Sequence, residues 1–335
     1  DEVVDLLLSS GLEGVSGNAG RVVLVVDTVA LLQGLGWELA ATLLRPAVRH
    51  QAGSPGGSLA YEHCRQLVAE RDLHRLARRR PPGQAAWGER DPDGFLELAV
   101  RWAEGTPEGR CELMGRALAA EVPLEDAADM ASLGAALLFL QETLGSGTEL
   151  LAEEDLHRAV PLATGIFSLA RLVRLGTPGQ RILGLLLAGW IAPVREVRLL
   201  LDRSDRTWWL PSVRSLREPA ATGEDGAPPP PAWARLVEQR QPNGLLPLLA
   251  ERLEAGGTAG PIEGALIPLA CALETAPGLS VRIARAFGEA YRASRAPQRW
   301  MHLWAASLAL ARWPAKAVAG GGEGRAADGE APAAT

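Results

Sequence analysis

Residues 17–50 read GNAGRVVLVVDTVALLQGLGWELAATLLRPAVRH, and the spacing of their apolar residues indicates the fold class. The run Val22–Val26 is strand-like on its own. The residues after it, Asp27–Leu32, continue at helical rather than alternating spacing, so the run is interpreted as part of a buried helix. Leu35–Glu38 separates it from a second apolar helix that ends at His50. The stretch therefore predicts a helical hairpin.

Outward from this hairpin, period-3.6 patterning dominates the chain and clean alternation is almost absent. Prolines near the first turn mark several predicted starts, as in Pro123–Asp126 and Thr177–Gln180. Residues 113–174 and 249–312 resemble each other as an imperfect internal repeat. The predicted fold is all-α, built from stacked helical hairpins. Helices are expected near 2–9, 20–34, 37–51, 58–79, 93–104, 110–120, 124–143, 153–174, 178–189, 192–202, 232–239, 244–254, 260–275, 278–293 and 297–312.

Composition changes along the chain suggest how it is divided. Residues 217–231 lack apolar periodicity and end in four consecutive prolines, which favour an extended conformation. We therefore expect an N-terminal hairpin array over 1–215 and a linker or exposed loop over 216–231. A C-terminal helical unit over 232–314 is expected to pack on the first. The Ala/Gly-rich residues 315–335 are expected to form a disordered tail.

Net charge, apolar run length and cysteine content argue against several classes of protein. The net charge is −6, with 34 Lys and Arg against 40 Asp and Glu, which argues against a nucleic-acid binder. The apolar stretches are broken too early for a membrane span. Three cysteines far apart fit neither a disulfide framework nor a metal motif, and a secretory signal pattern is missing. These features predict a cytoplasmic protein without nucleic-acid or membrane partners, and leave its oligomeric state open.

The hairpin also carries a family resemblance. Gly17–Ala19, Leu35–Glu38 and Leu43–Arg49, followed by Arg116–Leu138 and Leu156–His157, resemble the all-helical proteins related to questin oxidase. A domain of this kind also occurs beside Rieske-type domains. The similarity spans roughly residues 15–200. It implies an oxygenase of aromatic polyketide metabolism that oxidises or cleaves a flat phenolic, anthraquinone-type substrate, with a small aromatic molecule as partner.

The resemblance also implies a non-haem iron held mainly by histidines, for which His63, His157 and His302 are the candidate ligands. The family pattern has a histidine where this chain has Asn18, and the His-x-x-Thr sequence expected at His157 is not intact. The metal site is therefore expected to be degenerate or absent. Without metal, His157 or His302 would act as the general base toward a phenol.

Aromatic and histidine residues have a second, purely structural interpretation. Asn18, Trp190, Trp300 and Trp304 are candidate substrate-binding residues, yet tryptophans also fill gaps between packed helices. A lone histidine on an apolar helix is commonly a hydrogen-bonded core residue. His50 is expected to cap a helix end or to lie at the surface, and the Arg-rich run 75–90 is expected to be a solvated loop. The alternative function is accordingly a non-catalytic helical-repeat binding or interaction protein.

Overall fold

The valine-rich run of the opening hairpin is helical, as predicted. In the computed structural model Val22, Val25 and Val26 are buried within α2 (Gly20–Leu35), which packs against α1, α3 and α10. The structure describes residues 2–53, 57–76, 78–145, 153–191, 214–219, 231–273 and 278–312. These residues contain helices and no strand, so the all-α prediction is confirmed.

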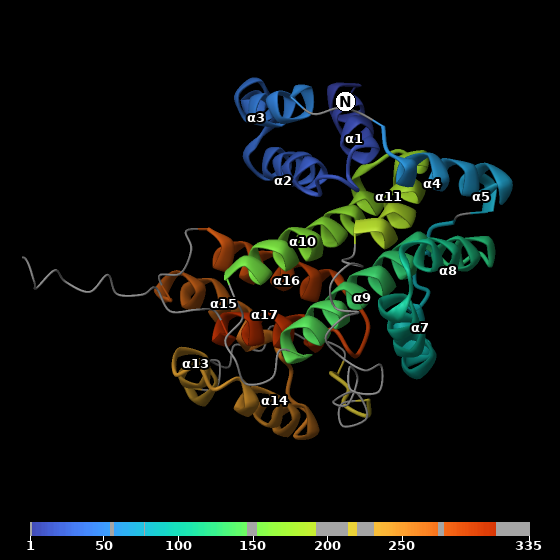
Figure 1. The fold of residues 1–335 in the computed structure, drawn as a ribbon. Coiled ribbons are helices and arrows are strands. Elements are labelled where there is room, and N and C mark those ends of the chain that lie inside the picture. The colour runs from blue at the N-terminus through green and yellow to red at the C-terminus, as the bar shows by residue number, and fades with distance from the viewer. Residues whose placement is uncertain are drawn as a thin grey trace, which may run out of the picture.

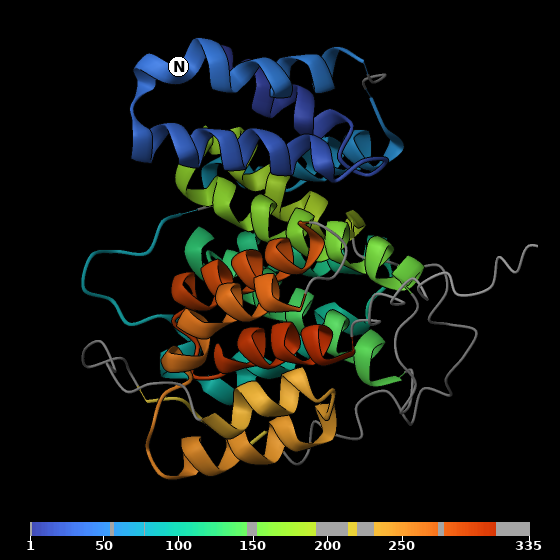
Figure 2. The ribbon, with the colours of Figure 1, turned by 90° about the vertical axis from the view of Figure 1, so that its left-hand side faces the viewer.

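The described helices mostly match the predicted ranges, and they are arranged in layers (Figures 1 and 2). Helices α1–α3 form one end and α13 and α14 the other, with α10 and α11 and then α9, α16 and α17 between them. The predicted helix at 192–202 lies outside the described residues. The helices are α1 (Glu2–Glu13), α2 (Gly20–Leu35), α3 (Ala40–Ala52), α4 (Leu59–Glu70), α5 (Leu73–Leu76), α6 (Trp87–Arg90), α7 (Pro92–Glu104), α8 (Pro107–Ala119), α9 (Leu124–Gly145), α10 (Glu153–Leu175), α11 (Pro178–Ile191), α13 (Pro231–Glu238), α14 (Leu245–Glu254), α15 (Gly260–Ala272), α16 (Leu279–Ala293) and α17 (Trp300–Arg312), with short 3-10 turns at Trp37–Leu39 and Pro242–Gly244.

The structure differs from prediction around residues 58–93. The expected single helix at 58–79 is two helices, α4 and α5, because the backbone at Asp72 has a φ of 49°, which interrupts the helix. Asp tolerates this left-handed conformation better than most residues. The short helix α6 lies in what was predicted to be a loop, and leads into α7, whose first turn is capped by the Asp91 side chain.

Helix α10 is the centre of the arrangement that positions the candidate site. It packs against α2, α9, α11 and α16, so it contacts segments far apart in the sequence. Phe287 of α16 is buried and meets Phe139 of α9 and Phe167 of α10, with ring centroids 5.1 and 4.8 Å apart. The buried apolar residues form one continuous core from the N-terminal to the C-terminal helices.

The predicted C-terminal unit is anchored partly through the first residues of the predicted linker. Glu218 is buried and accepts hydrogen bonds from the Ala259 amide (2.8 Å) and the Tyr291 hydroxyl (2.6 Å), and it pairs with Arg299 at 3.1 Å. Within 216–219, Glu218 thus contacts this unit, Arg217 pairs with Asp93 of α7 at 2.6 Å, and Pro219 is exposed. Residues 220–230 and 313–335 lie outside the described residues, and the boundaries at 215, 231 and 314 stay predictions.

The internal repeat also stays a prediction. Helix α10, which carries His157, packs against α2 and α11, whereas α17, which carries His302, packs against α13 and α14. The two predicted repeat units therefore have different surroundings. Within the described residues, we find no helix with the length and apolar character needed to span a bilayer.

Candidate functional site: a charged cavity between four helices

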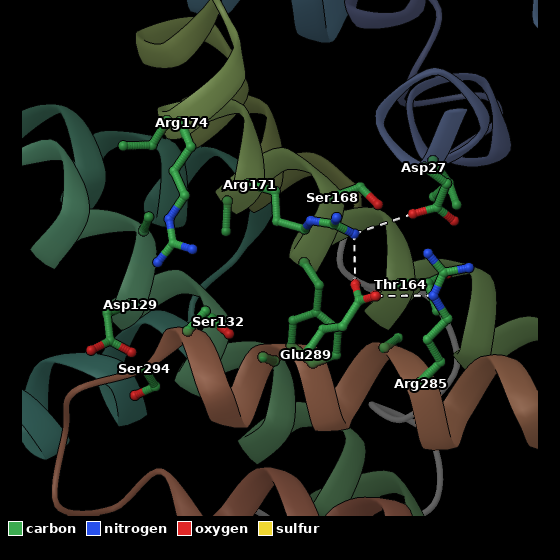
Figure 3. Close-up of a pocket in the computed structure, with 18 of the residues that line it drawn as sticks. Asp27, Asp129, Ser132, Thr164, Ser168, Arg171, Arg174, Arg285, Glu289 and Ser294 are labelled. Atoms are coloured by element: carbon green, nitrogen blue, oxygen red, sulfur yellow. Dashed lines mark hydrogen bonds and ion pairs between the residues drawn. The ribbon is translucent and has the colours of Figure 1, made fainter. Parts of the chain in front are cut away.

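A cavity of about 560 Å³ lies between α2, α9, α10 and α16 (Figure 3). Its lining is a mixture of apolar side chains, hydroxyl groups and charged groups, with six arginines and four carboxylates. Pockets that bind small molecules commonly have this volume and a few convergent polar groups. The charged lining residues are Arg80, Arg171, Arg174, Arg282, Arg285, Arg295, Asp27, Glu125, Asp129 and Glu289.

At one end of the cavity, a network of ion pairs ties three helices together (Figure 3). Arg171 of α10 pairs with Asp27 of α2 at 3.2 Å and with Glu289 of α16 at 2.6 Å. Glu289 also pairs with Arg285 at 2.9 Å. Burial raises the pKa of Asp27, and Arg285 and Arg171 act against this rise. The two carboxylates at this end are therefore paired within the protein, and Arg282 adds a further positive charge beside them.

The other end contains a carboxyl group that is only half satisfied. Asp129 Oδ2 accepts a hydrogen bond from the Arg295 amide at 3.1 Å, and the Ser294 hydroxyl also bonds this carboxyl. Oδ1 is shielded from bulk water and has no hydrogen-bond partner among the described residues. Burial is the main reason that the pKa of Asp129 is raised to about 6. This side chain lines the cavity (Figure 3).

One helical turn further along α9, Ser132 connects the cavity to a buried histidine. Its hydroxyl lies 3.1 Å from His302 Nε2, and His302 Nδ1 lies 2.9 Å from the Arg299 carbonyl oxygen. Because a carbonyl only accepts, Nδ1 carries the proton and Nε2 accepts from the Ser132 hydroxyl. Burial lowers the pKa of His302 to about 4, so the imidazole is neutral near pH 7.

Arg174 is one of three lining arginines, with Arg282 and Arg295, whose side chains form no ion pair with a described residue. It lies one turn after Arg171 on α10, and its guanidinium reaches into the cavity toward the end that holds Asp129 and Ser132 (Figure 3). No described residue forms an ion pair or hydrogen bond with its side chain, which stays accessible to solvent. Arg174 is therefore available to an anion in the cavity.

Of the predicted residues, Asn18 lies beside the cavity without lining it. Its Oδ1 accepts from the Gly20 amide at 2.9 Å at the start of α2, and its Nδ2 lies 3.5 Å from His50 Nε2. Gly20 and His50 are themselves part of the lining. His50 occupies the last turn of α3, as predicted, and in addition forms part of the cavity wall.

The predicted iron ligands are not brought together by the described side chains. His63 on α4 packs edge-on against Trp190 of α11, with ring centroids 5.7 Å apart, whereas His302 on α17 contacts Ser132 and Phe167. Helices α4 and α17 lie apart (Figure 1). Among the described residues no three His, Cys, Asp or Glu side chains cluster as metal ligands. The side chain of His157 lies outside them, so a metal site that includes it stays a prediction.

The candidate substrate-binding tryptophans lie in packing positions. Trp300 and Trp304 are buried in α17 with ring centroids 6.1 Å apart, and neither lines the cavity. Trp190 is half-buried against His63 and is also absent from the lining. Their arrangement agrees with the packing interpretation of these residues.

None of the lining residues was predicted from the sequence as a catalytic, substrate-binding or metal-binding residue. A signal existed, because polar residues recur every third or fourth position on otherwise apolar helices. Asp129 and Ser132 share one face of α9, Arg171 and Arg174 share one face of α10, and Arg282, Arg285 and Glu289 share one face of α16. Polar stripes of this kind on apolar helices indicate helix faces that meet at a polar site.

Comparison with known proteins yields no relative. No protein-family model matches the sequence, and no curated protein or solved structure matches it. The resemblance to questin oxidase-like proteins therefore rests on the residues given above, and the activity it implies stays a proposal.

Proposed function

We propose that this protein binds a small amphipathic organic anion in the cavity between α2, α9, α10 and α16. The observation that carries the proposal is Arg174, a guanidinium that enters the cavity without a partner among the described residues. Guanidinium groups bind carboxylates, sulfonates and phosphates through two parallel hydrogen bonds. An anionic ligand would provide the missing partner.

The distribution of charge supports an anion over a cation. Arg171 and Arg285 are paired with Asp27 and Glu289, and Arg282, which lines the same end, adds a further positive charge. At the other end the carboxyl of Asp129, with its raised pKa, gains a proton more easily than an ordinary aspartate. The local potential near Arg174 is therefore positive.

The remaining lining supports a ligand with an apolar body. Leu24, Pro161 and Phe167 contribute hydrocarbon and ring surface to the same cavity. Apolar surface that leaves water on binding contributes about 25 cal/mol per Å². A flat organic acid would place its charged group against Arg174 and its body against these side chains.

The test is a titration with 8-anilinonaphthalene-1-sulfonate, a fluorescent aromatic anion. We expect saturable binding to the wild type and roughly 10- to 100-fold weaker binding to Arg174→Gln, because a charge-assisted contact is worth about 1.5–3 kcal/mol. Arg116→Gln is the matched control, since Arg116 is exposed on α8 and away from the cavity lining. Equal affinity in Arg174→Gln and the wild type would refute the proposal.

An aromatic oxygenase is the second candidate, and one observation favours it. Gly20, Asp27 and His50 come from the segment that resembles questin oxidase-like proteins, and all three line the cavity. A phenolate is itself an amphipathic anion. The described histidines do not fit an iron centre, and His302 reaches the cavity only through Ser132, so the base in such a reaction is not assigned.

Oxygen consumption separates the two candidates. The wild type is incubated with a hydroxyanthraquinone in air-saturated buffer, with ferrous iron or with a chelator added. An oxygenase is expected to consume oxygen in proportion to the phenol, and Arg174→Gln to be slower because it binds the phenolate less well. If the phenol displaces the fluorescent anion without oxygen consumption in either condition, the protein binds such molecules and does not oxidise them.

A further inference from the structure

Two of the three cysteines lie in contact inside the fold, although they are far apart in the sequence. Cys64 of α4 and Cys111 of α8 are 47 positions apart, and their Sγ atoms lie 3.6 Å from each other. Both residues are 0% exposed, whereas Cys271 on α15 is exposed. The fold therefore brings one pair of thiols together in the core and leaves the third thiol at the surface.

The two helices are held close to each other beside this pair. Helices α4 and α8 pack against each other and both pack against α11 (Figure 1). A Cβ atom added at Gly115 of α8 would lie 3.0 Å from Leu67 Cδ2 of α4, so the missing side chain at Gly115 permits the close approach. Arg71, which follows α4, pairs with Glu112 of α8 at 2.5 Å. These contacts keep the two sulfur atoms near each other.

The distance between the sulfur atoms is compatible with a covalent bond after a small adjustment. A disulfide bond is about 2.0 Å long, so the two atoms would have to approach by about 1.6 Å. Two cysteines can be joined only when their side chains converge. Cys64 and Cys111 meet this requirement, because their thiols already touch.

We infer that Cys64 and Cys111 form an intramolecular disulfide when the chain folds in the presence of a small-molecule disulfide such as oxidised glutathione, and that this bond cross-links α4 to α8. One thiolate attacks oxidised glutathione and releases one molecule of glutathione. The second thiolate then attacks the mixed disulfide and releases the other. The two cysteines lose two electrons and two protons in total, and oxidised glutathione takes them up.

Burial assigns this reaction to folding rather than to the folded protein. Contact with Cys111 and burial raise the pKa of Cys64, so little of this thiol is present as the reactive thiolate once the protein has folded. Glutathione also cannot reach a residue that is 0% exposed unless α4 or α8 opens locally. The same burial would protect a disulfide that has already formed. The folded protein would therefore keep the redox state in which it folded.

The cross-link should stabilise the fold. It would join positions 64 and 111 and close the segment that contains α5, α6 and α7 and also Arg80 of the cavity wall. A bond between residues that are far apart in the sequence lowers the conformational entropy of the unfolded chain. The oxidised protein should accordingly unfold at a higher temperature than the reduced protein.

The experiment uses the whole chain with Cys271→Ser, which removes the exposed thiol. The reduced protein is unfolded in urea and refolded in a glutathione redox buffer, and the free thiols are then blocked and counted by mass spectrometry. We expect most refolded molecules to have no free thiol, and peptide mapping to find the link between positions 64 and 111. The linked protein should unfold at a temperature higher by roughly 5 °C or more. The folded, reduced protein should form the link at least about tenfold more slowly than the refolding protein.

Adding Cys64→Ala to this protein provides the control, because Cys111 then has no partner for an intramolecular bond. Its unfolding temperature should not rise after refolding in the same buffer. Refolded protein that keeps both thiols free would refute the inference, and so would linked protein that unfolds at a lower temperature than the reduced form. Equal rates of linkage in the folded and the refolding protein would refute the protection by burial. If Cys64→Ala does not fold, the peptide map of the protein with both cysteines decides.

Discussion

Replacing Arg80 with alanine is expected to destabilise the fold by about 3–5 kcal/mol, because it leaves a buried carboxylate without its partner. The Arg80 guanidinium pairs with Asp126, and the two side chains are only 12% and 1% exposed. Asp126 Oδ2 has no hydrogen-bond partner among the described residues, so no other side chain there would replace Arg80. The measurement is urea unfolding monitored by tryptophan fluorescence.

Arg78→Ala is the matched control on the same segment. Arg78 pairs with Glu121 at 3.6 Å, but these side chains are 65% and 54% exposed. Exposed pairs of this kind contribute roughly 0–1 kcal/mol. The double variant Arg80→Ala with Asp126→Asn should regain part of the lost stability, since the uncompensated charge is gone. A similar small loss for Arg80→Ala and Arg78→Ala would contradict the expected role of the buried pair.

Arg80 also shows which parts of the fold follow from local sequence and which do not. The spacing of apolar residues in the sequence predicted the positions of the helices well, including α2 with its run of β-branched valines. The Arg-rich run 75–90 was expected to be a solvated loop, and Arg78 and Arg79 are indeed exposed. Arg80 differs from them only because α9, more than forty positions later, places Asp126 beside it. Local composition contains no information about such a pairing.

The candidate site is harder to predict for the same physical reason. Four helices, α2, α9, α10 and α16, each contribute one face to the cavity wall. The sequence of any one of them does not identify the site. Sequence reasoning concentrated on histidines and tryptophans, the residue types that most often carry chemistry. In this fold His302 and Trp300 are buried core residues, and the polar cavity is built from arginines and carboxylates spaced along apolar helices. That spacing predicts polar faces, but not which faces meet.

Asp129→Asn is expected to stabilise the protein near neutral pH, the reverse of what the loss of a hydrogen-bonded aspartate usually does. Asp129 is more easily protonated in the folded protein than in the unfolded chain, because burial raises its pKa from 3.8 to about 6. Between these values the folded state binds more protons, so the contribution of Asp129 to stability falls as pH rises. Above about pH 6 the full penalty of the buried charge is present, and below about pH 4 it is absent.

The asparagine variant removes that titration and keeps the shape of the side chain. Its stability relative to the wild type should be higher by about 1–3 kcal/mol at pH 7.5, and the gain should shrink toward zero as the pH approaches about 4. His302, whose pKa is lowered to about 4, works in the opposite direction, since its neutral folded form loses stability as the pH falls below 6.5. Its contribution is common to both proteins and cancels in the difference.

Urea unfolding of both proteins at several pH values measures this difference directly. Asp93→Asn provides the matched control, because the Asp93 side chain is 66% exposed and pairs only at the surface with Arg217. Its stability difference should stay within about 1 kcal/mol at every pH. A constant difference for Asp129→Asn across the pH range would mean that the pKa of Asp129 is the same in the folded protein and in the unfolded chain. In that case Asp129 would be ionised at neutral pH without the cost of burial, which would contradict the expected stabilisation.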